Sequence, residues 1–114
     1  MCIRDRAEVL AAQKFARDQA EYVRTLNGVP NVDRLLVRSE RGMNGDDIKI
    51  IVNNEWHFQP FQVRLQLAQR LWQIWAGVHS PNNPDKAFIS LVDRNGNSVG
   101  GSSSLAGSIV HVDE

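Results

Sequence analysis

Residues 48–78 read IKIIVNNEWHFQPFQVRLQLAQRLWQIWAGV, and this stretch decides the fold. Its first part, residues 48–53, is an aliphatic run with partial two-residue alternation, which is typical of a β-strand. Pro60 suits the first turn of a helix, and the apolar residues after it recur at steps of three and four until Gly77. The stretch therefore predicts a strand followed by an amphipathic helix over residues 61–78.

The chain before this stretch predicts a long helix and the first half of a hairpin. No glycine or proline occurs over residues 5–26, and apolar residues recur there at helical spacing until Asn27-Gly28 provides a C-terminal cap. Residues 32–39 and 48–53 are rich in β-branched and aliphatic side chains, and the turn formers of residues 40–46 separate them. These two runs predict an antiparallel hairpin.

The chain after the second helix predicts further strands. Residues 87–92 are a third aliphatic run, and Asn95-Gly96 is the pair that a tight hairpin prefers. A fourth strand should begin near Asn97 and enter the Gly/Ser-rich segment 100–107. Residues 109–112 form either a short final strand or the continuation of the fourth.

The order of these elements sets the expected fold class. Helix, strand, strand, helix, strand, strand predicts an α+β sandwich of two layers, with a four-stranded antiparallel sheet and both helices on one face. A ferredoxin-like unit has this order when its first strand is moved to the end, so we expect a permuted ferredoxin-like topology. The 114 residues, 42% hydrophobic and 23% charged, predict one domain over residues 7–112.

The first residues have a different origin in our interpretation. Residues 1–6, MCIRDR, resemble a hexapeptide that recurs at the starts of unrelated metagenomic gene models, so we expect a non-native leader. An anchor or signal segment before Ala7 would then be missing, and membrane contact would depend on that segment. The chain as given reads as soluble. With a lost anchor, it would lie at the cytoplasmic or periplasmic face of the envelope.

Charge and motif spacing exclude several functions. Thirteen basic and thirteen acidic side chains cancel, which argues against nucleic acid as a partner. His57, His79 and His111 lack the spacing of a zinc site, so no metal or cofactor is expected. Asp93-x-Asn95 opens like a calcium loop, but the glycine and glutamate that this loop requires do not follow. The Gly/Ser-rich segment lacks the lysine of a phosphate-binding loop and the pattern of a serine nucleophile.

Two groups of residues remain as candidate sites. An apolar patch on the sheet face opposite the helices would mark a protein partner or a homo-oligomer. This candidate interaction surface consists of Leu36, Arg38, Ile51, Phe88 and Val92. The tryptophans predict core packing or, together with nearby histidines, a ligand pocket. This candidate pocket consists of Trp56, His57, Trp75 and His79.

Residues 48–100 also carry a resemblance. The motifs are Ile-x-Ile-x-Val from Ile48, a helix ending in Leu71-Trp72-x-x-Trp75, and the turn Val92-Asp93-x-x-Gly96. In these features the segment is similar to small uncharacterised bacterial modules, some cyanobacterial, that often follow an N-terminal membrane or coiled segment. The resemblance implies the α+β fold and an envelope-associated context, and it implies no activity and no binding residue.

Three functions follow as hypotheses. The first is a non-catalytic protein-interaction or accessory domain that acts through the apolar sheet face or the tryptophan-bearing helix. The alternative is a ligand-binding or enzymatic domain with a pocket near Trp56, His57 and His79. The third is an RNA-binding module, because Phe88, Arg38 and Lys49 would share the second sheet face.

Overall fold

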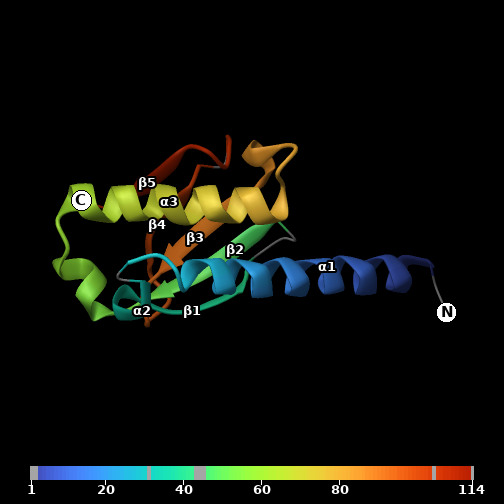
Figure 1. Cartoon of the computed structure of the whole chain (residues 1–114), viewed down its shortest axis with the longest axis horizontal. Coiled ribbons are helices and arrows are strands. Elements are labelled where there is room, and N and C mark those ends of the chain that lie inside the picture. The colour runs from blue at the N-terminus through green and yellow to red at the C-terminus, as the bar shows by residue number, and fades with distance from the viewer. Residues whose placement is uncertain (1–2, 31, 43–45, 104, 114) are drawn as a thin grey trace.

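The computed structural model describes residues 3–30, 32–42, 46–103 and 105–113, apart from the side chains of residues 3–9, 11 and 33. Two long helices cover one face of a five-stranded sheet (Figure 1). The elements in chain order are α1 (Ile3–Leu26), α2 (Val32–Leu35), β1 (Leu36–Arg41), β2 (Asp47–Val52), η1 (Asn54–Phe58), α3 (Phe61–His79), η2 (Pro84–Lys86), β3 (Phe88–Val92), β4 (Ser98–Ser102) and β5 (Val110–Val112). The α+β class and the two layers are as expected from the sequence.

The long helix α1 packs against the rest of the fold through one stripe. Phe15, Tyr22 and Leu26 are buried, and their steps of seven and four residues keep them on one side of the helix. The Tyr22 hydroxyl donates a hydrogen bond of 2.9 Å to the Leu71 carbonyl oxygen of α3. Burial raises the pKa of the Tyr22 phenol. Leu10, one turn before the buried stripe, is 59% exposed, so the packed part of α1 is its C-terminal half.

The second helix, α3, confirms the expected helix and the core role of its tryptophans. Trp75 is fully buried, and its indole Nε1 donates to the Asp46 carbonyl oxygen at 3.1 Å. The Trp72 indole donates to the Ala87 carbonyl oxygen at 2.8 Å. Each tryptophan therefore ties α3 to the residue just before a central strand. Among the described residues, no helix combines the length and the apolar character that crossing a bilayer requires.

The sheet differs from the expected four-stranded antiparallel one. Its order is β1-β2-β3-β4-β5, with β2 and β3 parallel and the other neighbours antiparallel. The crossover through α3 returns the chain to the starting end of β2, so β3 runs in the same direction as β2. The chain reverses after β4, and Val110–Val112 pairs beside it as a separate fifth strand. Strands consecutive in sequence are neighbours throughout, so the permuted ferredoxin-like order is wrong.

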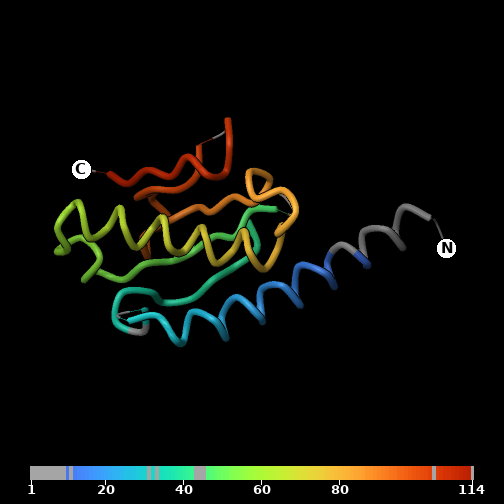
Figure 2. The backbone as a smooth tube through the Cα atoms, turned by 45° about the horizontal axis from the view of Figure 1, so that its top comes forward, coloured from blue at the N-terminus to red at the C-terminus, as the bar shows by residue number. Residues whose placement is uncertain are grey.

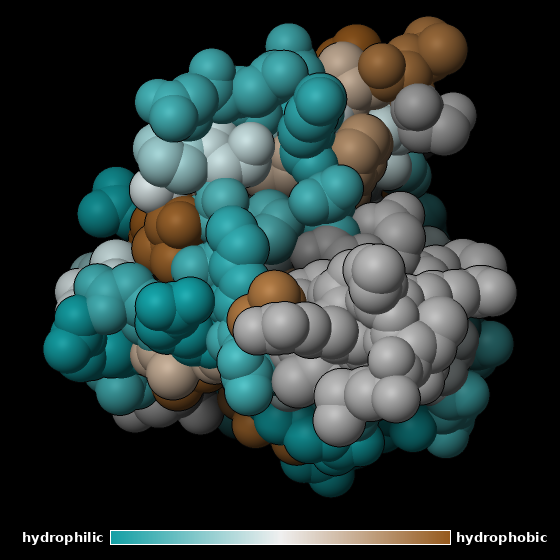
Figure 3. Space-filling model, turned by 90° about the vertical axis from the view of Figure 1, so that its right-hand side faces the viewer, coloured by the Kyte–Doolittle hydropathy of each residue, from teal (hydrophilic) through white to brown (hydrophobic). Residues whose placement is uncertain are grey.

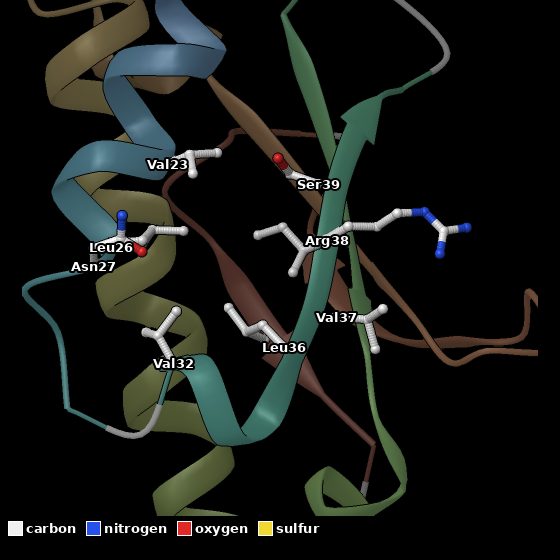
Figure 4. Close-up of a pocket in the computed structure, with 9 residues that line it drawn as sticks. Val23, Leu26, Asn27, Val32, Leu36, Val37, Arg38 and Ser39 are labelled. Atoms are coloured by element: carbon white, nitrogen blue, oxygen red, sulfur yellow. The ribbon is translucent and has the colours of Figure 1, made fainter.

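The start of β1 also differs from the expectation. Val32–Leu35 forms one helical turn, α2, and the strand begins only at Leu36. The pairing of β1 with β2 shifts between Leu36 and Arg38, which is a β-bulge at Val37. The bulge changes the expected face of Leu36, which packs against the core, whereas Arg38 points away from α1 as expected, and so does Val37 (Figure 4). Leu36 therefore leaves the expected second face.

The two edges of the sheet lie at opposite sides of the molecule. β1, beside α1, forms one edge, and β5 forms the other (Figure 2). α3 packs mainly over β3 and β5, and α1 lies over the β1 side. No helix of the described residues lies against the face of the sheet opposite α1 and α3, and we refer to this face as the open face.

Candidate functional site

The candidate pocket residues fall into two groups at opposite ends of α3. Trp56 and His57 lie in η1 before the helix, whereas Trp75 and His79 lie in its last two turns. At 1.5 Å per residue, a helix of 19 residues is about 28 Å long. Trp56 is fully buried and His57 is exposed. The structure therefore does not gather these four side chains around one cavity.

His79 has the most constrained polar environment of the candidate residues. Its Nδ1 lies 2.9 Å from Asp18 Oδ2 of α1, and its Nε2 lies 2.8 Å from Asp46 Oδ1 before β2. The imidazole stacks on the Trp75 indole, with ring centroids 4.6 Å apart and planes within 4°. Lys14 Nζ bonds Asp18 at 2.7 Å. We call the group of His79, Asp18 and Asp46 the His79 clasp.

The His79 clasp joins three parts of the fold. An imidazole between carboxylates can relay protons, but the His79 side chain is only 6% exposed. Both ring nitrogens already have carboxylate partners, and the rings of Trp75 and Phe15 pack against the imidazole. Among the coloured residues at the end of the molecule where α3 ends and β2 begins, hydrophilic ones predominate (Figure 3). The clasp is therefore a tie between α1, α3 and β2. Among the described residues, no three His, Cys, Asp or Glu side chains gather as metal ligands.

The open face carries the other members of the candidate interaction surface. Ile51 and Val92 pair across β2 and β3, and Phe88 lies on the same face by strand alternation. Ile51 is nevertheless only 5% exposed. It shares a hollow of about 450 Å³ with charged side chains, among them Arg38 and Glu40. Charged side chains therefore surround the apolar residues Ile51 and Val92 on this part of the open face.

The charges beside β1 form a small network. Arg38 Nε lies 2.7 Å from Glu40 Oε1, and Lys49 Nζ lies 3.7 Å from Glu40 Oε2. The hydrogen bond from Arg38 and the nearby charges of Arg38 and Lys49 hold the pKa of the Glu40 carboxyl below its ordinary value. Glu40 is therefore ionised and already occupied by both cations at neutral pH.

A second hollow, of about 490 Å³, lies over β4 on the open face. Gly100 and Gly101 place no side chains there, and the rim includes His111 of β5. The Ser90 hydroxyl lies 3.0 and 3.1 Å from the two carboxylate oxygens of Asp47, which is mostly buried. Polar side chains such as Ser90, Ser102 and His111 line this hollow together with the apolar Ile89 and Val92, and His111 stands on β5, not at the end of α3 where His79 lies.

A third hollow separates α1 from β1, and six of its nine lining residues are apolar. Its volume is about 170 Å³. Val23 and Leu26 point into it from α1, and Val32 and Leu36 point toward each other from α2 and β1 (Figure 4). We call it the α1/β1 groove. Its lining residues are Val23, Leu26, Asn27, Val32, Leu36, Val37, Arg38, Ser39 and Ile50.

The strand beside this groove has an unpaired edge. The Gly42 N–H donates to the Asp47 carbonyl oxygen at 2.8 Å, which makes Gly42 and Asp47 a hydrogen-bonded pair of the antiparallel ladder. Hydrogen-bonded pairs alternate with pairs whose backbone N–H and C=O groups point away from the partner strand. Ser39 and Ile50 form such a non-hydrogen-bonded pair, so the N–H and C=O of Ser39 point outward from the sheet edge. The Gln19 amide donates to the outward Ser39 carbonyl at 2.9 Å, which leaves the Ser39 N–H directed at the edge.

The α1/β1 groove is not among the sites that the sequence predicts. The groove depends on the bulge at Val37 and on the helical turn α2, and neither has a clear pattern in the sequence. One signal in the sequence is Val23, an apolar residue near the end of α1. The structure leaves it 42% exposed, so it is not needed for the core.

The chain matches no protein-family model, no curated protein and no solved structure.

Proposed function

We propose that the domain is a non-catalytic protein-interaction module that binds an extended segment of a partner protein along β1. One apolar side chain of that segment enters the α1/β1 groove. A single juxtaposition carries the proposal: an edge strand with an outward N–H lies directly beside an apolar groove of about 170 Å³.

The backbone of β1 supports strand addition. An extended peptide that joins a sheet edge gains main-chain hydrogen bonds, while pockets for its alternate side chains provide selectivity. The Ser39 N–H offers such a donor, and the Gln19 amide already satisfies the Ser39 carbonyl. The bulge and the charged side chains of β1 discourage indiscriminate pairing with other edges. The edge therefore suits a bound partner segment, which we call the guest, that also contributes side-chain contacts.

The groove supplies those contacts. Residues on one face of an added strand point to the helix side, so the guest residue opposite Ser39 faces α1. An apolar cavity of about 150 Å³ in another protein accepts a benzene molecule, and the groove has a similar size. It therefore fits one large aliphatic or aromatic side chain, which we call the anchor.

The experiment compares two substitutions at Ser39. Ser39→Pro removes the outward N–H, and proline is tolerated in edge strands where the N–H does not join the ladder. Ser39→Ala removes the hydroxyl but keeps the N–H, and serves as the matched control. A displayed library of random 12-residue peptides is selected on the wild-type chain, and the affinities of the enriched peptides are measured for all three proteins by titration calorimetry.

We expect enriched peptides to share one large apolar residue, to bind Ser39→Ala like the wild type and to bind Ser39→Pro at least tenfold more weakly. Circular dichroism and thermal unfolding show whether Ser39→Pro keeps the fold. If Ser39→Pro unfolds, Val23→Lys at the groove mouth replaces it, with the same expected loss. Equal binding by the folded variant, or the absence of any enriched peptide, would contradict the proposal.

A further inference from the structure

Resting on the proposed function, we infer that the bound segment carries an acidic residue directly next to its apolar anchor, and that this carboxylate contacts Arg38 on the open face. The juxtaposition behind this inference is an apolar groove on one side of β1 and a net positive hollow on the other. The inference concerns the chemistry of the partner, whereas the proposed function concerns where and how the partner binds.

The alternation of an added strand connects the two sides. When the anchor opposite Ser39 points to the helix side, its two sequence neighbours point to the open face. Those neighbours then lie beside Arg38 and Glu40, which flank Ser39 on β1. In an antiparallel guest the residue after the anchor lies beside Arg38, and in a parallel guest the residue before it does.

The charges of the open-face hollow beside Arg38, with a volume of about 450 Å³, favour the binding of a carboxylate. Three described cations line it, Arg38, Lys49 and Arg94, against two carboxylates, Glu40 and Asp93. Both carboxylates already have partners. Glu40 lies within ion-pair distance of Arg38 and Lys49, and Asp93 accepts hydrogen bonds from the backbone N–H groups of Asn95 and Asn97.

Arg38 is the cation best placed to bind the guest. Its side chain is 61% exposed, and its contact with Glu40 uses Nε, only one of the five N–H donors of a guanidinium. Arg38 also stands on the edge strand itself, so no other strand separates it from the guest. A carboxylate next to the anchor can therefore reach the remaining N–H groups without displacing Glu40.

The expected contribution is modest because the site is exposed. Ion pairs at exposed positions change an equilibrium by up to about fivefold, and salt screens them. The acidic neighbour therefore selects among apolar segments, while the anchor and the backbone bonds supply most of the affinity. A neighbour of opposite charge should weaken binding by a similar factor, because it would lie close to Arg38 and Lys49.

The experiment uses three fluorescein-labelled nonapeptides with one central leucine, whose two neighbours are both glutamate, both glutamine or both lysine. Fluorescence anisotropy measures their affinity for the wild type, for Arg38→Gln and for Arg70→Gln. Arg70 is exposed on α3, which packs on the sheet face opposite Arg38, so Arg70→Gln is the matched control for the loss of one positive charge. Each titration is run at low and at moderate salt.

We expect the glutamate peptide to bind the wild type about three- to fivefold more tightly than the glutamine peptide, and the lysine peptide to bind most weakly. Arg38→Gln should remove this order, and Arg70→Gln should keep it. Similar affinities of all three peptides for the wild type, with sensitivity to Ser39→Pro, would overturn the acidic preference and leave the proposed function standing. No binding by any of the three, while library-selected peptides bind at β1, would overturn the inference as well.

Discussion

Removing the imidazole of the His79 clasp should destabilise the fold by about 3 kcal/mol. The side chain is 6% exposed and forms hydrogen bonds of 2.9 and 2.8 Å to Asp18 and Asp46. Two such bonds contribute about 1 kcal/mol each, even with the exposure of Asp46 taken into account, and the stacked contact with Trp75 contributes about 1 kcal/mol more. His79→Ala loses all three contributions, whereas His79→Phe keeps a ring beside Trp75 and should lose about 2 kcal/mol.

Urea unfolding followed by tryptophan fluorescence at neutral pH measures these differences. His111→Ala, an exposed histidine on β5, is the control and should change the free energy of unfolding by less than about 0.5 kcal/mol. The slope of the transition should stay constant, because the folded state exposes no additional surface. A loss below about 1 kcal/mol for His79→Ala, or wild-type stability of His79→Phe, would refute the clasp.

Four further substitutions test other parts of the structure. Tyr22→Phe removes one buried hydrogen bond and should lower the free energy of unfolding by about 1 kcal/mol, measured by urea titration. Gly101 has a φ of +143°, and an added Cβ would lie 2.7 Å from a backbone oxygen of β3, so Gly101→Ala should lower the free energy of unfolding by about 3 kcal/mol. Gly77 lies in a helix with open space around it, so Gly77→Ala should raise the free energy of unfolding by up to about 1 kcal/mol. The hydrogen bond from the Asn97 backbone N–H lowers the pKa of the Asp93 carboxyl, so its stabilisation is present above about pH 4 and lost as the pH falls further. Asp93→Asn should therefore flatten the decrease in melting temperature below that pH, and an unchanged pH profile would contradict this assignment.

The sequence determined the helices of this fold more firmly than its sheet. The period of the apolar residues in α1 and α3 follows from the helix geometry alone, so both long helices were expected with nearly correct ends. The pairing of strands depends on where crossovers return the chain, which no local pattern records. β2 and β3 are parallel because the connection through α3 returns the chain to the end of the sheet where β2 begins. The Gly/Ser-rich segment has no clear turn pattern, so the change of direction between β4 and β5 could not be located from the sequence.

The candidate site was harder to predict for a similar reason. A bulge of one residue at Val37 moves Leu36 from one face of the sheet to the other, and the residues at this position show no turn or glycine signal. The expected apolar patch assumed that Ile51 would be exposed, but side chains on neighbouring strands leave it 5% exposed. Of the two interpretations of the tryptophans, core packing describes Trp75, which is fully buried, and Trp72 is partly buried against the same core.

The most direct test of the account is the position of the anchor in the bound protein. In a complex with an isotope-labelled peptide from the selection, nuclear Overhauser effects locate the anchor side chain relative to the methyl groups of the protein. We predict contacts from the anchor to Val23, Leu26 and Leu36 in the α1/β1 groove, together with backbone contacts to Ser39. Contacts from the anchor to Ile51 and Val92 on the open face instead would contradict the account.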